Sequence, residues 1–354
     1  GYDGADALAG ARHLVQEQDA VLVMMLGGDS FTEVRDYLMG HKVLTSSLLT
    51  SDLSPDTPYL IAPGESLPIY TVTAVEWIAK HRSEIKTVAL CAQTDALGLP
   101  ALAAYRAAFK AVGIEIVAEI RYDPGTATAP EVVTPMLAAA PDMLCWCTSY
   151  TPMVHAMTEY AYHQGYAGQI LSCTADCYEQ LIALTSPEFM EGFLFQFPDF
   201  DDPALAEKAF FFNQPQAFYE EYNARFPGSW TAVSWEYAAI LDIWQSAVER
   251  AGTVNSVSVL AAMRQLGEVN HAFGPAQWWG QDMFGLDHTL IGDWPVVQIQ
   301  GGKARIVDFG SIPDWLAQHE ALLRVEMAAL GQLWHQRHGQ GAGKACLEAR
   351  LVVS

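Results

Sequence analysis

The segment AVLVMMLGGDS, residues 20–30, has the arrangement on which the fold depends: an apolar strand that runs directly into a short polar loop. A strand that is apolar at every position is typical of a parallel sheet whose two faces are both covered by helices. The pattern recurs at TVALC (87–91), MLCWC (143–147) and QILSC (169–173), each followed by small or hydrogen-bonding residues. The sequence therefore predicts an α/β fold of parallel sheets flanked by helices.

The loops after these strands are the predicted binding site. In open α/β sheets, ligands bind outside the carboxyl ends of the strands. We expect five loops to line one pocket: residues 27–30, 48–50, 93–97, 149–150 and 174–176.

Composition limits the classes of function. A chain of 354 residues with 51% apolar and 17% charged residues suits two well-packed domains. The formal net charge of −22 disfavours nucleic acid and anionic lipid as partners and favours a freely diffusing monomer. No apolar run approaches the ~20 residues that span a bilayer. Residues 1–18 do not read as a signal peptide, but an export signal is removed on maturation, so the compartment stays open.

The remaining pattern is also one of alternating strands and helices. A helix at residues 5–18 precedes the first strand, which leads us to expect further strands upstream. Gly301 and Gly302 are expected to form a hairpin turn, and the tail from Gly339 to be loosely ordered. Further strands are expected at 43–47, 59–64 and 191–197 and within 273–307, and helices at about 68–81, 177–184, 216–226, 235–251, 257–266 and 312–338.

This order of elements resembles the type I periplasmic binding proteins, specifically the branched-chain amino acid (Leu/Ile/Val) binding family of ABC importers. The resemblance extends from residue 1 to about 315 and is diffuse, without a single diagnostic motif. Relative to that family, the first strand, the first helix and the second strand of lobe I are missing. The matching segments are Ala11 to Leu26, Pro58 to Ile61, Lys86 to Ala92, Asp142 to Trp146, Met153 to Gly165, Tyr237 to Ala251 and Phe273 to Pro275.

The resemblance implies two α/β lobes that close over a ligand, joined by crossings near Gly64–Leu67, Pro198–Asp202 and about Val297–Gly301. It further implies a periplasmic protein without catalysis or cofactor, which delivers its ligand to the membrane subunits of an ABC transporter. A cytoplasmic amide or amino-acid sensor on the same fold is the alternative. The expected boundaries are 1–65 and 200–297 for an incomplete lobe I, 66–199 and 298–330 for lobe II, and 331–354 for a C-terminal tail.

Lobe I carries the expected carboxylate-binding loops. In the family, the loop after the first strand binds the ligand's carboxylate through hydroxyl and backbone N–H groups. Here Gly27, Gly28, Asp29 and Ser30 match it, at the start of a helix that favours anions. Asp29 is also a candidate N-cap. The second such turn is Leu48, Leu49 and Thr50.

Lobe II departs from the family, which commonly places Tyr, Tyr and Glu on three loops, the Glu receiving the ligand's ammonium. The matching positions are near Leu97, Ser149 and Thr174, and none is charged. Tyr150 and Asp176 could substitute, although Asp176 could instead cap the following helix. A small organic or aromatic acid is therefore expected to bind at least as well as an aliphatic amino acid. Thr94 and Phe200 complete the set of expected ligand-binding residues, and Trp146, Tyr150, Phe200 and Trp235 could form an aromatic wall or pack as core.

Three other kinds of site have weaker sequence support. Cys91, Cys145, Cys147 and Cys173 are expected to be buried free thiols rather than metal ligands, while a Cys173–Cys177 or Cys91–Cys147 disulfide stays open. Gly28-Asp29-Ser30 matches the nucleophile block of GDS esterases, with Asp287-His288 or Asp282 as partners, but the other blocks are missing. There is no dinucleotide-binding Gly pattern, and His335 and His338 lack an acidic partner.

Overall fold

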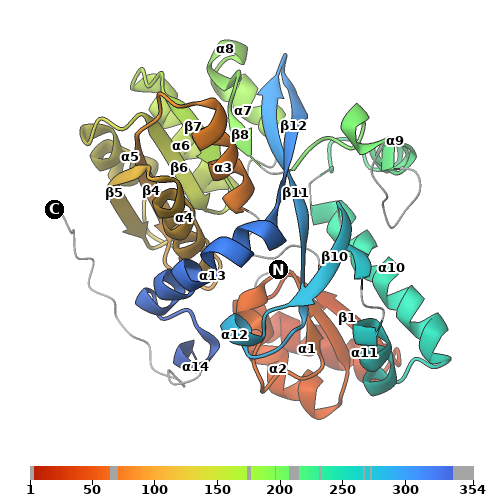
Figure 1. Ribbon diagram of the computed structural model, residues 1–354. Helices are drawn as coiled ribbons and strands as arrows, with labels where there is room; N and C mark the ends of the chain where they lie inside the picture. The colour runs from red at the N-terminus through yellow and green to blue at the C-terminus, as the bar shows by residue number, and fades with distance from the viewer. Residues whose placement is uncertain are drawn as a thin grey trace.

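The computed structural model has two lobes, each an α/β unit, as the sequence predicts (Figure 1). It describes residues 4–63, 71–173, 177–195, 197–206, 215–230, 233–265, 268–271 and 273–337. The expected crossing at Gly64–Leu67 and the tail from Gly339 lie outside these residues.

Lobe I contains a small parallel sheet in the order β1-β2-β3, formed by β1 (Leu22–Met25), β2 (Leu44–Ser47) and β3 (Leu60–Ile61). Helices α1 (Gly4–Gln16) and α2 (Asp29–Gly40) pack against each other beside it. Helices α10 (Val233–Ala251) and α11 (Ser256–Gln265) form a second core cluster with Leu44 and Ile61. Both faces of the sheet are therefore covered, and every residue of β2 and β3 is buried.

Lobe II contains the parallel strand order β5-β4-β6-β7-β8. The sequence predicted the four strands β4 (Thr87–Gln93), β6 (Met143–Thr148), β7 (Gln169–Ser172) and β8 (Leu194–Phe195). It did not predict β5 (Glu115–Tyr122), an edge strand that is mostly half-exposed and so lacks a continuous apolar run. The helices of this lobe are α3 (Val72–His81), α4 (Gly98–Val112), α5 (Ala129–Ala138), α6 (Thr151–His163), α7 (Tyr178–Leu184) and α8 (Pro187–Met190).

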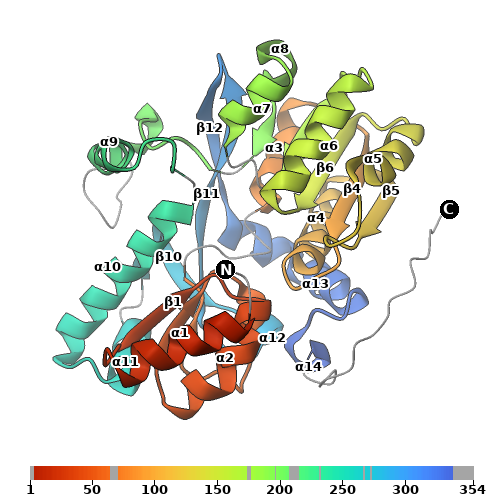
Figure 2. The same ribbon diagram turned by 180° about the vertical axis from the view of Figure 1, so that it is seen from behind.

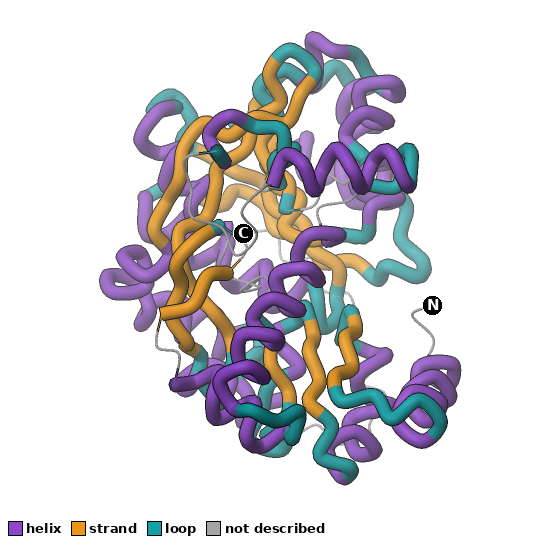
Figure 3. Tube along the Cα trace, turned by 90° about the vertical axis from the view of Figure 1, so that its right-hand side faces the viewer, coloured by secondary structure: helices purple, strands orange, loops and turns teal. Residues whose placement is uncertain are grey.

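Strand β11 (Thr289–Gln300) physically joins the lobes (Figure 2). Its first half pairs with β10 (Gly274–Trp279), and Thr289 bridges to Ala62 beside β3. Its second half pairs with β8 and with β12 (Lys303–Ser311), and the register of the β12 pairing shifts between Val296 and Val297. In the side view of Figure 3, the strands of the larger sheet accordingly extend above the short strands of lobe I. The predicted Gly301–Gly302 hairpin turn is confirmed, with both residues at positive φ.

The C-terminal third differs from the prediction at the strand-rich segment 273–307, which also contains the helix α12 (Gln281–Phe284), and at the last helix. The expected helix at 312–338 is two helices, α13 (Ile312–Ala329) and α14 (Trp334–Arg337), separated at Gly331, whose φ is +69°. Helix α13 packs on α4 of lobe II. The remaining elements are β9 (Glu268–His271), α9 (Pro215–Arg225), α12 (Gln281–Phe284) and the 3₁₀ turns Thr50–Asp52 and Pro203–Leu205.

Among the described residues, no helix is both long and apolar enough to cross a membrane.

Candidate functional site

The loop after β1 makes a tight turn into α2. Gly27 has a φ of +104°, and a Cβ there would lie 2.1 Å from Ser47 Oγ. Gly28, also at positive φ, is the N-cap of α2. The expectation that Asp29 is the N-cap is therefore wrong, because Asp29 is already the first helical residue; its side chain lies outside the description. Ser30 is buried, and its hydroxyl donates to the carbonyl of Gly27 at 2.8 Å.

The loop after β2 is almost completely buried. Leu48 and Leu49 are apolar core residues. Thr50 begins a single 3₁₀ turn and is 1% exposed. Within the described part of the chain, its hydroxyl has no hydrogen-bond partner. A buried hydroxyl without a partner costs about 1–3 kcal/mol, so this group is suited to receive a polar atom of a ligand.

Asp52, at the end of the same turn, was not predicted as a site residue. Its Oδ2 accepts the N–H of Gly28 at 2.9 Å and the hydroxyl of Ser47 at 2.7 Å. One carboxylate thus ties together the loops after β1 and β2, which is the reason that Gly27 must lack a Cβ. Only a tertiary structure brings these loops together, and the sequence offered no signal beyond an acid two positions after Thr50.

The expected lobe II loops after β4 and β6 form one hydrogen-bonded network. Asp95 Oδ1 accepts the backbone N–H groups of Leu97 and Gly98 at the start of α4. Its Oδ2 accepts from the Gln93 amide at 2.6 Å and from the Tyr150 hydroxyl at 3.3 Å. The N–H of Tyr150 in turn donates to Gln93 Oε1 at 3.0 Å. Asp95, which caps α4, is thereby held in place by both loops.

Tyr122, at the end of β5, forms hydrogen bonds with the same two loops. Its hydroxyl donates to Ser149, and its carbonyl accepts the Thr94 hydroxyl at 3.2 Å. Burial raises the pKa of Tyr122, so it stays protonated and keeps its donor. Ser149 and Thr94 are therefore both held by the chain itself.

The two lobes touch where these loops meet. The Ser51 hydroxyl of lobe I donates to the carbonyl of Ala96 of lobe II at 3.0 Å. The structure therefore brings the loop after β2 next to the loop after β4. Thr174 and Asp176 lie outside the described residues.

The expected aromatic residues do not form one wall. Phe200 is 1% exposed and packs between Trp230 and Phe273, with ring centroids 5.5 and 6.5 Å away. Trp146 is fully buried in lobe II, where its indole N–H donates to Thr158 at 3.1 Å. Tyr150 is 37% exposed, and the side chain of Trp235 lies outside the description.

A second acid that sequence reasoning missed is Asp199, beside the expected crossing at Pro198–Asp202. It is buried and accepts the Tyr178 hydroxyl at 2.6 Å. Burial raises the pKa of Asp199. Tyr178 is the first residue of α7, which follows the loop after β7, so this pair lies at the carboxyl ends of the strands.

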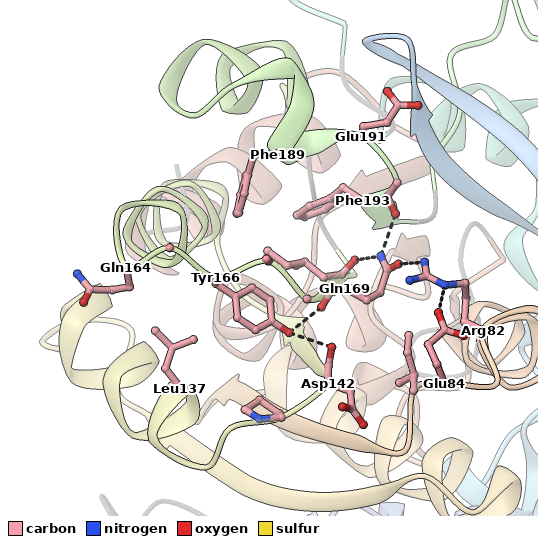
Figure 4. Close-up of a pocket in the computed structure, with 17 residues that line it drawn as sticks. Arg82, Glu84, Leu137, Asp142, Gln164, Tyr166, Gln169, Phe189, Glu191 and Phe193 are labelled. Carbon is pink, nitrogen blue, oxygen red and sulfur yellow. Dashed lines mark hydrogen bonds and ion pairs between the residues drawn. The ribbon is translucent and has the colours of Figure 1, made fainter.

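A cavity of about 730 Å³ lies on lobe II, at the amino ends of the strands and so away from the loops described above (Figure 4). It borders residues just before β4, β6, β7 and β8. Its polar groups bond mainly to one another: Arg82 donates to Gln169, and Tyr166 contacts the carbonyls of Asp142 and Gln169. Another cavity, of about 550 Å³, runs along β1 and α1. Neither cavity involves the loops described above, apart from Ser30 in the second.

The residues considered for an esterase site, a metal site or a disulfide have other roles in the structure. His288 is buried with Nδ1 2.7 Å from the carbonyl of Leu60, and Ser30 bonds to Gly27, so they do not form a nucleophile–base pair. Cys91, Cys145, Cys147 and Cys173 are buried free thiols, and Cys177 is a half-buried one. No cluster of His, Cys, Asp and Glu suited to a metal ion occurs in the described ranges.

A family model described as periplasmic binding protein matches residues 1–304. No curated protein sequence matches the chain significantly. Among solved structures, a leucine binding protein (LivK) from Thermotoga maritima has a TM-score of 0.70 at 16% identity, covering 88% of this chain and 86% of that chain. An ABC transporter solute binding protein from R. palustris in complex with 4-hydroxybenzoate has a TM-score of 0.72 at 15% identity, with coverages of 89% and 85%. A Rhodopseudomonas palustris BisB5 solute binding protein in complex with 3,4-dihydroxy benzoic acid has a TM-score of 0.69 at 16% identity, covering 88% of this chain and 84% of that chain. At these identities the likeness concerns the fold.

Proposed function

The chain belongs to the periplasmic binding protein family, and we propose from this premise that it is the solute-binding component of an ABC importer. It binds one small molecule between the lobes, and the lobes close on binding. The observation that carries the proposal is the meeting of the loops after β2 and β4, through Ser51 and Ala96, next to the buried hydroxyl of Thr50, which has no partner among the described residues.

The proposed ligand is a small carboxylate-containing molecule, an amino acid or an aromatic or other organic acid. The solved neighbours with 4-hydroxybenzoate and 3,4-dihydroxy benzoic acid support the aromatic class, and the leucine binding protein supports the amino acids. The lobe II loops carry no glutamate where an ammonium would bind, and the one acid described there, Asp95, already accepts four hydrogen bonds. A buried ammonium without an acidic partner costs several kcal/mol, so this supports the organic acids.

The proposal extends to compartment and partners. We place the protein in the periplasm as a monomer that meets the membrane subunits of its transporter, and we assign it no catalytic activity. Within the described part of the chain, the Ser30 hydroxyl donates to the carbonyl of Gly27 and not to a base. Sustained ester hydrolysis that disappears in Ser30→Ala would overturn this part. The same fold as a cytoplasmic amide sensor is the competing function, and a regulatory protein that co-purifies with the chain would favour it.

Ligand class is tested by thermal shift against two panels, the branched-chain amino acids and a set of benzoates. We expect benzoates to raise the melting temperature at least as much as the amino acids do. Asp176→Asn, at the remaining position for an ammonium partner, should leave the benzoate response unchanged. If only amino acids stabilise the protein and Asp176→Asn abolishes the effect, the amino-acid ligand is correct. Native mass spectrometry of the isolated protein then identifies what co-purifies.

A further inference from the structure

Two donors of lobe I that suit a ligand's carboxylate are already occupied by a carboxylate of the chain. Asp52 Oδ2 accepts the Gly28 N–H at the start of α2 and the Ser47 hydroxyl at the end of β2. A backbone N–H at a helix N-terminus together with a hydroxyl group is a common way of binding an anion. The same two donors cannot hold two carboxylates, because the like charges would repel each other at this distance.

We propose that Asp52 is a specificity-determining residue that acts as an internal ligand: an incoming carboxylate reaches the Gly28 N–H and the Ser47 hydroxyl only by taking the place of Asp52. This rests on the proposed function, since it concerns the same cleft. Carboxylates must compete with Asp52, whereas neutral polar groups can bind to the Thr50 hydroxyl without displacing it. Asp52 therefore lowers the affinity for acids relative to their neutral analogues.

The surroundings of Asp52 provide a position for the displaced carboxylate. The Arg337 guanidinium of α14 donates to the carbonyl of Leu53 at 3.3 Å, and its Nε is buried without a hydrogen-bond partner within the described residues. Burial lowers the pKa of Arg337 to about 10, while the charge of Asp52 opposes the shift. The guanidinium therefore lies beside the residue that follows Asp52, and among the described residues its Nε–H has no acceptor. On displacement, the Asp52 carboxylate turns toward Arg337.

The turn that carries Asp52 also carries the contact between lobes. Thr50–Asp52 is a single 3₁₀ turn between extended residues, and Ser51 within it donates to Ala96 of lobe II. A displacement of Asp52 therefore moves the residue that touches the other lobe. Carboxylate exchange and lobe contact are coupled through three consecutive residues.

The first experiment is chemical rescue with acetate, which is the missing carboxylate alone. In Asp52→Ala, the two donors are vacated, so acetate should raise the melting temperature in a saturable manner, while acetamide should not. The wild type and Asp56→Asn, an exposed acid in the same segment, should not respond to acetate. If Asp52→Ala does not fold unaided, its recovery of structure in acetate but not in acetamide is the same readout. Equal responses of wild type and variant to acetate would overturn the proposal.

The second experiment measures binding of benzoate and benzamide, a matched acid and amide. In Asp52→Asn and Asp52→Ala we expect the preference for benzoate over benzamide to rise about ten- to hundredfold, the amount that one charge-assisted hydrogen bond is worth. If the preference for benzoate over benzamide is unchanged, Asp52 does not determine specificity. If acetate rescues Asp52→Ala but neither probe nor any amino acid binds wild type or variant, the internal ligand stands and the proposed function fails.

Discussion

At the scale of single residues, Gly27 is a position where both the backbone angle and the surroundings require glycine. Its φ of +104° is unfavourable for any residue with a side chain, and a Cβ would approach Ser47 Oγ and Asp52 Oδ2 at 2.1 and 2.3 Å. Gly27 therefore permits both the turn and the carboxylate bridge that closes it.

Gly27→Ala should lower the free energy of unfolding by about 2 kcal/mol or more, since backbone strain of about 1–3 kcal/mol adds to the clash. Urea unfolding measures it. Gly113→Ala is the matched control: its φ is +74°, but nothing lies within 4 Å of the added Cβ. It should cost only about 1 kcal/mol, the left-handed penalty alone. Equal losses in the two variants would contradict the clash.

Thr50 has a buried hydroxyl that the chain does not use, as far as the described residues show. Thr50→Val keeps the shape and removes the hydroxyl, so the free energy of unfolding should stay level or rise by about 1 kcal/mol. Ligand affinity should nevertheless fall about tenfold, because the ligand loses a donor. The control is Thr45→Val, whose buried hydroxyl donates to the carbonyl of Val43 at 3.1 Å; it should lose stability and keep ligand affinity. A stable Thr50→Val with full affinity would remove Thr50 from the site.

At the scale of elements, the small sheet of lobe I is held to the long strand β11 by His288 and its neighbour. His288 Nδ1 lies 2.7 Å from the carbonyl of Leu60, and the N–H of Ala62 donates to the carbonyl of His288 at 2.8 Å. The Thr289 hydroxyl donates to the carbonyl of Ala62 at 2.7 Å. These three contacts connect β3 of the lobe I sheet to the start of β11, which lies more than 200 positions later in the chain.

Burial lowers the pKa of His288 below 6.5, partly offset by the bond to Leu60. The unfolded chain therefore binds a proton more readily than the folded chain does. The stability that His288 contributes is complete above pH 6.5 and is lost as the pH falls from there through its folded pKa. Unfolding curves should show that the free energy of unfolding falls less over this pH window in His288→Gln than in the wild type. His13→Gln, an exposed histidine of α1, should follow the wild type; identical profiles for all three proteins would refute the assignment.

At the scale of the whole molecule, the proposed closure of the lobes depends on the contacts between the cleft loops. The hydrogen bond from Ser51 to Ala96 is one of them, and a neutral hydrogen bond contributes about 0.5–1.5 kcal/mol. Ser51→Ala should therefore reduce the closed population of the ligand-free protein about two- to tenfold, seen as a larger radius of gyration in solution scattering. Ser54→Ala serves as control, because its buried hydroxyl has no partner in the described ranges. If both variants scatter like the wild type, Ser51 does not hold the lobes together.

The sequence by itself determined the α/β class, most of the strands and helices, and which loops follow the predicted parallel strands. These features follow from local periodicity, since a strand covered on both faces is typically apolar along its length, whereas the loop at its carboxyl end can be polar. The edge strand β5 was not predicted for the same reason, because its residues are mostly half-exposed.

Only the tertiary structure decided what the polar groups of those loops do. Ser30, Thr94 and Ser149 read as ligand donors in the sequence, yet each bonds to a neighbour that folding brings close. Asp52 and Arg337 are separated by 285 positions in the printed sequence, yet Arg337 donates to the carbonyl of Leu53, the residue after Asp52. A hydrogen bond depends on distances of about 3 Å between atoms, and residue type and spacing along a chain do not contain that information. The sequence therefore predicted the framework of the site, and its internal pairing is a property of the fold.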